Sequence, residues 1–279
     1  MAQVSIGMTY IYSLILGIVQ GITEFVPVSS SGHLVVLHEI WQSNISDSLT
    51  FDVALHLGTL FAVVIYFRVE ILRYLVAILE IFIPGRKVNK ADLSEVMLII
   101  YATVPAAIIG ILFEQTIDDF FRNIWTVVFT LIIGAGLLFL VEKYSKDNSR
   151  HFSGMGIGRA LYIGFAQALA LIPGLSRSGI TIVAGMSTKL KRREAARFSF
   201  LISIPVILGA GIFKLMDVDW EALPASEILV FIVGFVSSWL VGFLAIKYFL
   251  KFLEHHKLNV FGWYRICLAL ILIILMLWR

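Results

Sequence analysis

The stretch GIVQGITEFVPVSSSGH, from Gly17 to His33, decides how the rest of the chain is organised. It sets a cluster of polar side chains between two apolar arms. A second stretch of the same design, GFAQALALIPGLSRSGIT, runs from Gly164 to Thr181. Each carries Gly-x-x-Gln, an apolar run, a proline and a Ser-x-Ser-Gly element. Counted from the opening glycine, Ser30 is 13 residues on in the first stretch and Ser176 is 12 residues on in the second. Two such polar breaks in so apolar a chain predict one site that is made twice and brought together.

The composition excludes a soluble domain. The chain is 59% hydrophobic and 15% charged, and its mean hydropathy is +0.92. Apolar runs of about 17–20 residues recur, and each is long enough to cross a bilayer core of roughly 30 Å as a helix. We therefore predict an all-α polytopic membrane protein with a single domain, residues 1–279. The net charge of +3 reflects loops that face a membrane surface and gives no reason to expect nucleic acid as a partner.

Six apolar segments are long enough to span the membrane, whereas the arms around the two motifs are too short. Interrupted helices at membrane depth are tolerated when they are buried in protein or line a wet cavity. We therefore expect each motif to form a re-entrant helix hairpin that enters and leaves on the same side. The predicted spans are Phe51–Phe67, Val96–Phe113, Trp125–Val141, Ala195–Phe213, Ile228–Ile246 and Phe261–Trp278. The short arms are Thr9–Val19, Leu34–Trp41, Ala160–Ile172 and Ile180–Thr188.

The order of these ten helical segments predicts an inverted-topology repeat. A hairpin keeps the chain on one side and three spans change the side, so the second half starts from the opposite face. The halves cover about residues 1–145 and 155–279. Such repeats place their sites near the membrane midplane, between the halves.

The distribution of basic residues predicts the orientation. With the N-terminus outside, 18 of the 22 Lys and Arg residues, Arg265 included, fall on cytoplasmic pieces. Three fall on outer pieces, and Arg177 lies in the second motif. Lys and Arg concentrate on the cytoplasmic side of membrane proteins, so we expect both termini outside. The two hairpins then enter from opposite sides and their tips meet near mid-membrane.

Each tip has the composition of an anion site. Small hydroxyl residues and a glycine precede the second arm, which is typical of a helix N-cap. Free backbone N–H groups and the positive end of the helix dipole would then point at the tip. Arg177 adds a planar cationic fork suited to phosphate oxygens. The alternative is that these residues only cap a helix, but two copies and one arginine favour the anion site.

Four further residues of the motifs bring reactive chemistry: Gln20, Glu24, Ser30 and His33. Glu24 and Arg177 would each cost at least about 2.5 kcal/mol at the bilayer centre unless paired or hydrated, so a purely structural ion pair is one interpretation. Ser30 and His33 are three residues apart at a helix start, which would allow His33 to activate the hydroxyl. Gln20 and Glu24 share a helix face and could hold a divalent cation, or Glu24 could serve as a general base.

Asp52 and His56 lie four residues apart near the outer end of a predicted span. They could support the site or lie only at the membrane interface, and His56 could equally be a hydrogen-bonded core residue. The sequence leaves these alternatives open.

At this point the sequence resembles a known family, the bacterial undecaprenyl-diphosphate phosphatases of the bacitracin-resistance protein type. That family carries Glu/Gln-x-x-x-Glu followed by Pro-Val-Ser-Ser-x-Gly-His, which here run from Gln20 to Glu24 and from Pro27 to His33. Its second signature, Pro-Gly-x-Ser-Arg-Ser-Gly-x-Thr, is complete from Pro173 to Thr181. The agreement in spans, loop order and length extends along essentially the whole chain.

The resemblance implies removal of the terminal phosphate of undecaprenyl diphosphate on the outer side of the bacterial cytoplasmic membrane. That reaction regenerates the carrier lipid for peptidoglycan and other envelope polymers and protects against bacitracin. The resemblance also implies a divalent cation, Mg²⁺ or Ca²⁺, with Glu24 and Gln20 as ligands. Many relatives have Glu where this chain has Gln20, so the essential carboxylate here should be Glu24. The implied catalytic residues are Glu24, Ser30, His33 and Arg177, and the implied substrate-binding residues are Gln20, Ser29, Ser176, Ser178 and Thr181.

Two other functions fit parts of the pattern. Inverted repeats with broken helices are a transporter architecture, so a transporter or flippase of a polyprenyl phosphate or another anionic lipid is the main alternative. An intramembrane serine protease fits less well, because an arginine-bearing anion site suits phosphate better than a peptide carbonyl. Besides the lipid substrate and membrane lipids, a homodimer is a partner that the sequence leaves open.

Overall fold

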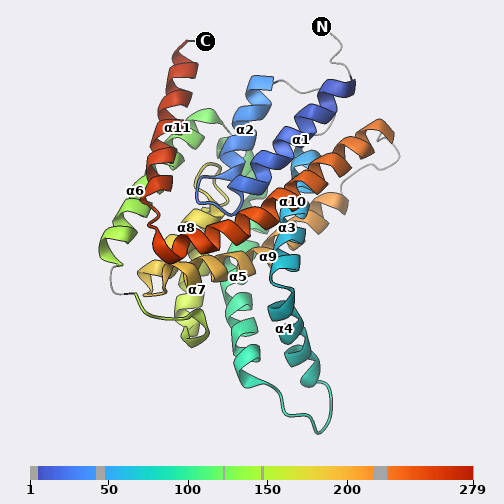
Figure 1. Ribbon diagram of the computed structural model, residues 1–279, viewed down its shortest axis with the longest axis vertical. Coiled ribbons are helices and arrows are strands. Elements are labelled where there is room, and N and C mark those ends of the chain that lie inside the picture. Colours follow the sequence, from blue (N-terminus) through green and yellow to red (C-terminus); the bar gives the residue numbers. More distant parts are fainter. Residues whose placement is uncertain (1–5, 42–47, 122, 146–147, 217–224, 279) are drawn as a thin grey trace.

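The computed structural model describes residues 6–41, 48–121, 123–145, 148–216 and 225–278. Within these residues the chain is helical, with one isolated β-bridge between Arg150 and Leu190 (Figure 1). The helices are α1 (Ile6–Thr23), α2 (Ser30–Trp41), α3 (Ser48–Tyr66), α4 (Arg68–Glu80), α5 (Lys90–Phe121), α6 (Ile124–Tyr144), the 3₁₀ turn η1 (Phe152–Gly154), α7 (Ile157–Leu169), α8 (Arg177–Ser187), α9 (Arg192–Met216), α10 (Ala225–His255) and α11 (Asn259–Leu277).

The helices identify a polytopic membrane protein. In the described part of the chain, five helices are long and apolar enough to cross a membrane: Lys90–Phe113 of α5, α6, α9, Glu227–His255 of α10, and α11. Less than half of the most apolar window of each is buried inside the protein, so these helices present apolar side chains outward, as lipid requires. The sixth predicted span is α3, which is not among these five, because its described apolar part, Thr50–Tyr66, is shorter than the length required.

The sequence does not predict α4, which lies in the connection between two spans. This helix is short and carries charged residues at both ends, so no membrane-length apolar run marks it. It packs against the beginning of α5, where the Tyr74 hydroxyl donates to Glu95 (2.6 Å) and Arg73 lies 3.8 Å from Asp92. The α4–α5 connection extends below the rest of the molecule (Figure 1).

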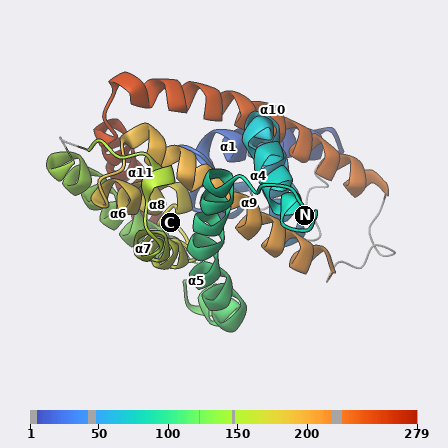
Figure 2. The ribbon, with the colours of Figure 1, turned by 90° about the horizontal axis from the view of Figure 1, so that it is seen from below.

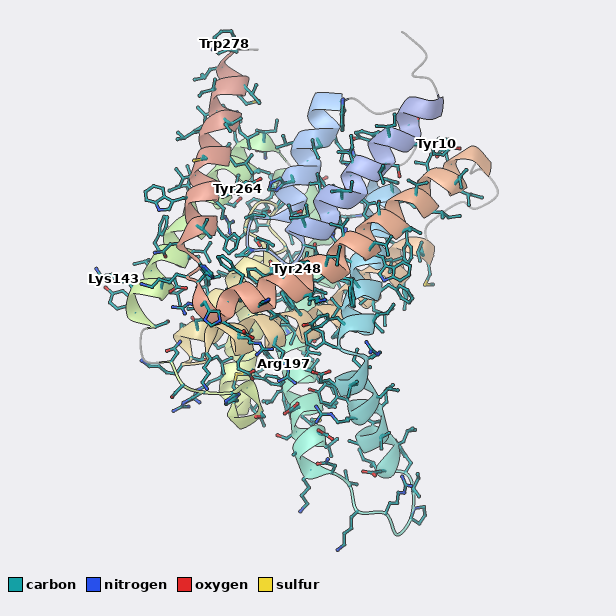
Figure 3. The ribbon with its side chains drawn as sticks, in the orientation of Figure 1. Tyr10, Lys143, Arg197, Tyr248, Tyr264 and Trp278 are labelled. Carbon is teal, nitrogen blue, oxygen red and sulfur yellow. The ribbon has the colours of Figure 1, made fainter. Side chains whose placement is uncertain are left out.

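Two pairs of short helices bend inside the molecule, at the predicted positions. The bend between α1 and α2 covers residues 24–29, and the bend between α7 and α8 covers residues 170–176. The two bends lie beside each other at the centre of Figure 1. α1 begins and α11 ends at one end of the molecule, where Figure 3 places Tyr10 and Trp278. The α4–α5 connection marks the opposite end.

The packing between the halves is reciprocal. α1 packs on α10, and α7 packs on α5, so the first helix of each hairpin contacts a span of the other half. α3 pairs with α9, and α6 with α11. Two related halves would exchange partners in this way; the inverted repeat itself stays a prediction.

Small residues bring α1 and α10 close together. A Cβ atom at Gly21 would overlap backbone atoms of Ser238 and Gly242 on α10, and Gly17 is equally close to α10. Such small-residue contacts are a common way for membrane helices to associate. Figure 2 shows α10 running along one side of the molecule, across α1, and α10 also packs on α3. This contact fixes the position of α1 along α10. It therefore also fixes the position of Glu24, which directly follows the last turn of α1.

Candidate active site

The two bends end in helix caps of the same geometry. Ser29 precedes α2 with φ 74°, and its hydroxyl accepts from the Gly32 N–H (3.2 Å). Ser176 precedes α8 with φ 72°, and its hydroxyl accepts from the Gly179 N–H (3.1 Å). A left-handed backbone costs a non-glycine residue roughly 1–2 kcal/mol, and such strain clusters at functional sites. The sequence therefore folds the same strained cap twice.

These caps correct the alignment of the two motifs. Ser29 and Ser176 are equivalent, and each lies 12 residues after the opening glycine of its motif, so the apparent difference of one residue disappears. Ser30 then corresponds to Arg177, and both are the first residues of their helices. The two bends thus present different reactive groups from the same position.

Glu24 is the meeting point of the two bends. Its Oε1 accepts from Arg177 Nη2 (2.6 Å), and its Oε2 accepts from the Ser30 hydroxyl (2.7 Å) and from Gln20 Nε2 (3.0 Å). His56 Nε2 lies 3.7 Å from the same Oε2. The Glu24 side chain is 6% exposed and that of Arg177 is 13% exposed. This geometry brings Glu24, Ser30 and Arg177 into direct contact.

A second set of contacts holds Arg177 in place. Its Nη1 donates to the Ser199 carbonyl on α9 (3.1 Å). The Thr181 hydroxyl is bonded to the Ser199 hydroxyl (2.7 Å) and donates to the Arg177 carbonyl (2.7 Å). Because α8 and α9 both fix the arginine, its guanidinium is pre-positioned toward Glu24.

The cluster opens into a cavity of about 360 Å³. Its polar lining includes Glu24, Ser30, Ser31, His56 and Arg177. Apolar side chains from α2, α3, α5 and α9 and from the second bend form much of the remaining wall, including Leu34, Val35, Val53, Ala106, Leu171, Val206 and Ile207. Asp52 and Lys214 also line it. An apolar pocket with a few converging polar groups is the form expected of a ligand site.

The other predicted substrate-binding residues lie behind this lining. Gln20, Ser29, Ser176, Ser178 and Thr181 are all buried and are not among the described residues that line the cavity. Gln20 and Thr181 contact the cavity groups from behind, and the three serines shape the caps. Their contact with a substrate stays a prediction.

His33 faces away from the cavity. Its Nδ1 donates to the Ser29 carbonyl (2.6 Å), which leaves Nε2 of the neutral ring to accept from the Tyr264 hydroxyl of α11 (2.8 Å). The two rings are stacked, and Figure 3 labels Tyr264 between α11 and α2. The Ser30 hydroxyl is bonded to Glu24, so the structure does not bring Ser30 and His33 together as a pair.

The histidine that lines the cavity is His56, whose role the sequence leaves open. Its Nδ1 donates to the carbonyl of Asp52 one turn earlier on α3 (2.7 Å), so Nε2 points toward Glu24. The Asp52 carboxylate is itself bonded to His38 Nε2 (2.8 Å). The spacing of Asp52 and His56 is the only sequence signal, and it does not say which face of α3 meets the site.

The oxygen donors fit a partial cation site. In the described part of the chain, no group of three or more His, Cys, Asp or Glu side chains could hold a metal ion. However, Gln20 Oε1 is buried beside Glu24 without a hydrogen-bond partner among the described residues. With the Gln20 amide turned so that Oε1 instead of Nε2 faces Glu24, one carboxylate and one amide oxygen would suit a Mg²⁺ or Ca²⁺ ion that takes its other ligands from phosphate and water.

The fold and the site together define a polytopic membrane protein whose two helical hairpins hold a carboxylate, a hydroxyl and a guanidinium at one cavity. The family described as "Bacitracin resistance protein BacA" matches residues 13–271. This chain belongs to that family.

Curated relatives cover nearly the whole chain. A protein of Rubrobacter xylanophilus is 47% identical over 95% of this chain and 97% of its own length. A protein of Pelobacter propionicus is 40% identical over 93% of this chain and 94% of its own. One of Elusimicrobium minutum is 39% identical over 96% and 98%. All three carry the name undecaprenyl-diphosphatase.

Proposed function

We infer that this protein is an undecaprenyl-diphosphate phosphatase, a hydrolase that removes the terminal phosphate of the C55 carrier lipid and returns the monophosphate to peptidoglycan synthesis. The family and the names of the relatives support this function and the associated bacitracin resistance. The observation that carries it is the contact of Glu24 with both Ser30 and Arg177 inside a lipid-compatible cavity.

The geometry supports Ser30 as nucleophile and Glu24 as its base. As the Ser30 oxygen attacks the terminal phosphorus, the hydroxyl proton passes to Glu24 Oε2, 2.7 Å away. The bond from that phosphorus to the bridging oxygen breaks, and the lipid monophosphate leaves with the proton that Glu24 had taken up. A water molecule then attacks the phosphoserine and gives a proton to Glu24. As the bond between Ser30 and phosphorus breaks, Glu24 returns this proton to the Ser30 oxygen and inorganic phosphate is released. Because the structure bonds Ser30 to Glu24, we assign the base role to Glu24 and a positioning role to His33.

Arg177 is the phosphate clamp in this scheme. Its guanidinium stabilises the charge that develops on the transferring phosphoryl group, as arginine does in other phosphoryl transfers. His56 Nε2 faces the same space, 3.7 Å from Glu24 Oε2, and places a polar group beside the bound phosphate. A divalent cation held by Glu24 and Gln20 would neutralise phosphate charge. Treatment with EDTA should then lower activity, and Mg²⁺ or Ca²⁺ should restore it. If EDTA leaves the activity unchanged, the cation has no part in the reaction.

Supporting observations also point to an orientation. The basic α4–α5 connection lies opposite the end where α1 begins and α11 ends (Figure 1). We propose that this connection is cytoplasmic in the bacterial inner membrane, that both termini are outside, and that the cavity opens toward the outer face. Light scattering of the purified protein would decide whether it is a monomer or a homodimer.

The function is tested with purified protein in detergent. Wild-type protein should release inorganic phosphate from a C55 or C15 diphosphate. Glu24→Ala, Ser30→Ala and Arg177→Ala should each lower kcat by roughly 10³-fold. Absence of phosphate release by wild-type protein would refute the function, and full activity in Arg177→Ala would refute the clamp.

The reciprocal packing of the two halves favours one second candidate, a transporter of an anionic lipid. In proteoliposomes, transfer of a labelled polyprenyl phosphate between leaflets without phosphate release would select this alternative.

A further inference from the structure

Arg265 of α11 is a buried cation that lies against both bends. It is 1% exposed and heads the largest fully buried side chains among the described residues. The sequence-based count places it with the cytoplasmic residues, and the structure corrects this, because the guanidinium lies in the interior beside the site. No sequence motif includes it, and the mechanism above does not use it.

Among the described residues, the guanidinium donates to carbonyl oxygens of the bends and of α6. Nη2 donates to Gly174 (2.7 Å) and Leu175 (2.9 Å) in the second bend, and more weakly to Thr130 (3.5 Å) on α6. Nη1 donates to Pro27 (3.4 Å) in the first bend. One side chain therefore ties together two bends that are almost 150 residues apart in sequence.

The surroundings select an arginine at this place. A Cβ atom at Gly134 of α6 would overlap the guanidinium, so a glycine makes room for it. Gly174 lies in the second bend with φ +89°, a conformation that glycine adopts easily, and its carbonyl points toward Arg265. Lysine has one compact ammonium group and cannot reach several fixed carbonyls with a planar fork.

The charge of Arg265 is not matched by an acid. Within the described residues it forms no ion pair, and its Nε has no hydrogen-bond partner. Arg177, by contrast, is paired with Glu24. An unmatched positive charge behind the bends favours an anion in the cavity, since its field is weakly screened in a low-dielectric interior.

We propose that Arg265 is a positioning residue of the phosphatase site. It holds the first bend, which carries Glu24 and Ser30, in register with the second bend, which carries Arg177, and its charge adds to the attraction for the diphosphate. This role rests on the proposed function. It acts through Leu175, two residues before Arg177, and requires no contact between Arg265 and the substrate.

The test separates the shape of the side chain from its charge. Arg265→Lys keeps the charge, Arg265→Gln keeps hydrogen-bond donors, and Arg265→Met keeps neither. We expect kcat to fall roughly 100-fold in Arg265→Met, because small misplacements of reacting groups have effects of this size. Arg265→Lys should recover about tenfold of that loss, and the KM for the diphosphate should be higher in Arg265→Gln than in Arg265→Lys. Arg197→Met is the control, since Arg197 pairs with Glu70 and does not line the cavity.

Wild-type kcat and KM in folded Arg265→Met would overturn the proposal. If that variant does not fold, Gly134→Ala replaces it, because the added methyl group crowds the guanidinium without changing any charge. An unchanged kcat in Gly134→Ala, together with equal kinetics in Arg265→Lys and Arg265→Gln, would also overturn the proposal. Glu24→Ala is measured in parallel. Phosphate release by Glu24→Ala would refute the proposed site, whereas an inactive Glu24→Ala beside a normal Arg265→Met would refute only the positioning role. If wild-type protein releases no phosphate, Arg265 is still tested by the rise in thermal stability that inorganic pyrophosphate gives to wild-type protein and to each Arg265 variant. An equal rise in wild-type protein and in Arg265→Met would overturn the role of Arg265.

Discussion

At the scale of single residues, the site depends on one carboxylate with several partners. Glu24 accepts hydrogen bonds from Arg177, Ser30 and Gln20 in an almost fully buried place. Removing one member of a buried ion pair leaves an uncompensated charge, which costs about 3–5 kcal/mol, whereas removing both members often costs less. The stability of the protein can therefore tolerate the loss of both side chains, whereas catalysis needs both of them.

A double-mutant cycle on Glu24 and Arg177 tests this coupling. We expect Glu24→Ala and Arg177→Ala each to destabilise the protein by about 3 kcal/mol, and the double variant to be no less stable than either. All three should be inactive. The measurement is the unfolding free energy in a denaturing detergent titration. Strictly additive losses would show that the two side chains do not form the pair.

The two histidines near the first bend should respond differently to conservative changes. His56→Gln keeps a polar group near Glu24 and should retain activity, whereas His56→Leu should lose roughly 10²-fold in kcat. His33→Phe keeps the stacking on Tyr264 and should retain more activity than His33→Ala. Steady-state kinetics on the four variants measure this. Equal losses in His33→Phe and His33→Ala would assign the imidazole itself a chemical role.

At the scale of helices, the sequence predicts what depends on length and hydropathy. The six spans and the four short arms all appear as helices, because an apolar run of fixed length has few alternatives in a membrane. The sequence misses α4, whose charges resemble those of a loop. It also misaligns the caps by one residue, since the choice between Ser29 and Ser30 depends on a backbone angle that composition does not reveal.

The close contact of α1 with α10 gives a prediction for a helix face. Gly21→Leu would push the two helices apart three residues before Glu24, so we expect lower thermal stability and a large loss of kcat. Gly136→Leu on α6 is the matched control, because a Cβ atom there has no neighbour within 4 Å. A normal kcat in folded Gly21→Leu would show that the depth of α1 does not govern the site.

At the scale of the whole molecule, the meeting of the two bends could be predicted, but the groups that reach them from other helices could not. Glu24, Ser30 and Arg177 lie in motifs that the sequence displays. His56 and Arg265 come from α3 and α11, and their positions depend on how those helices rotate and pack. A single sequence gives the apolar length of a helix more reliably than the direction of one side chain.

The orientation of the molecule is tested by labelling. In a variant with Cys267 replaced by Ser, single cysteines at Arg86 in the α4–α5 connection and at Trp278 after α11 should react oppositely with a membrane-impermeant maleimide applied to spheroplasts. We expect labelling at position 278 and protection at position 86 until the membrane is opened. The reverse pattern would invert the proposed topology and place the cavity mouth on the cytoplasmic side.

The ion pair between the bends has one more consequence. The Glu24 carboxylate accepts a hydrogen bond from the same guanidinium that would bind a phosphate oxygen. An incoming headgroup must compete with this resident anion, so abundant lipids with a single diffuse charge are poor competitors and a diphosphate is a strong one. Once the terminal phosphate has passed to Ser30, the lipid headgroup carries less charge and competes less strongly with the carboxylate for Arg177, which favours its exit. The same pair thus sets a charge threshold for entry and assists the exit of the product.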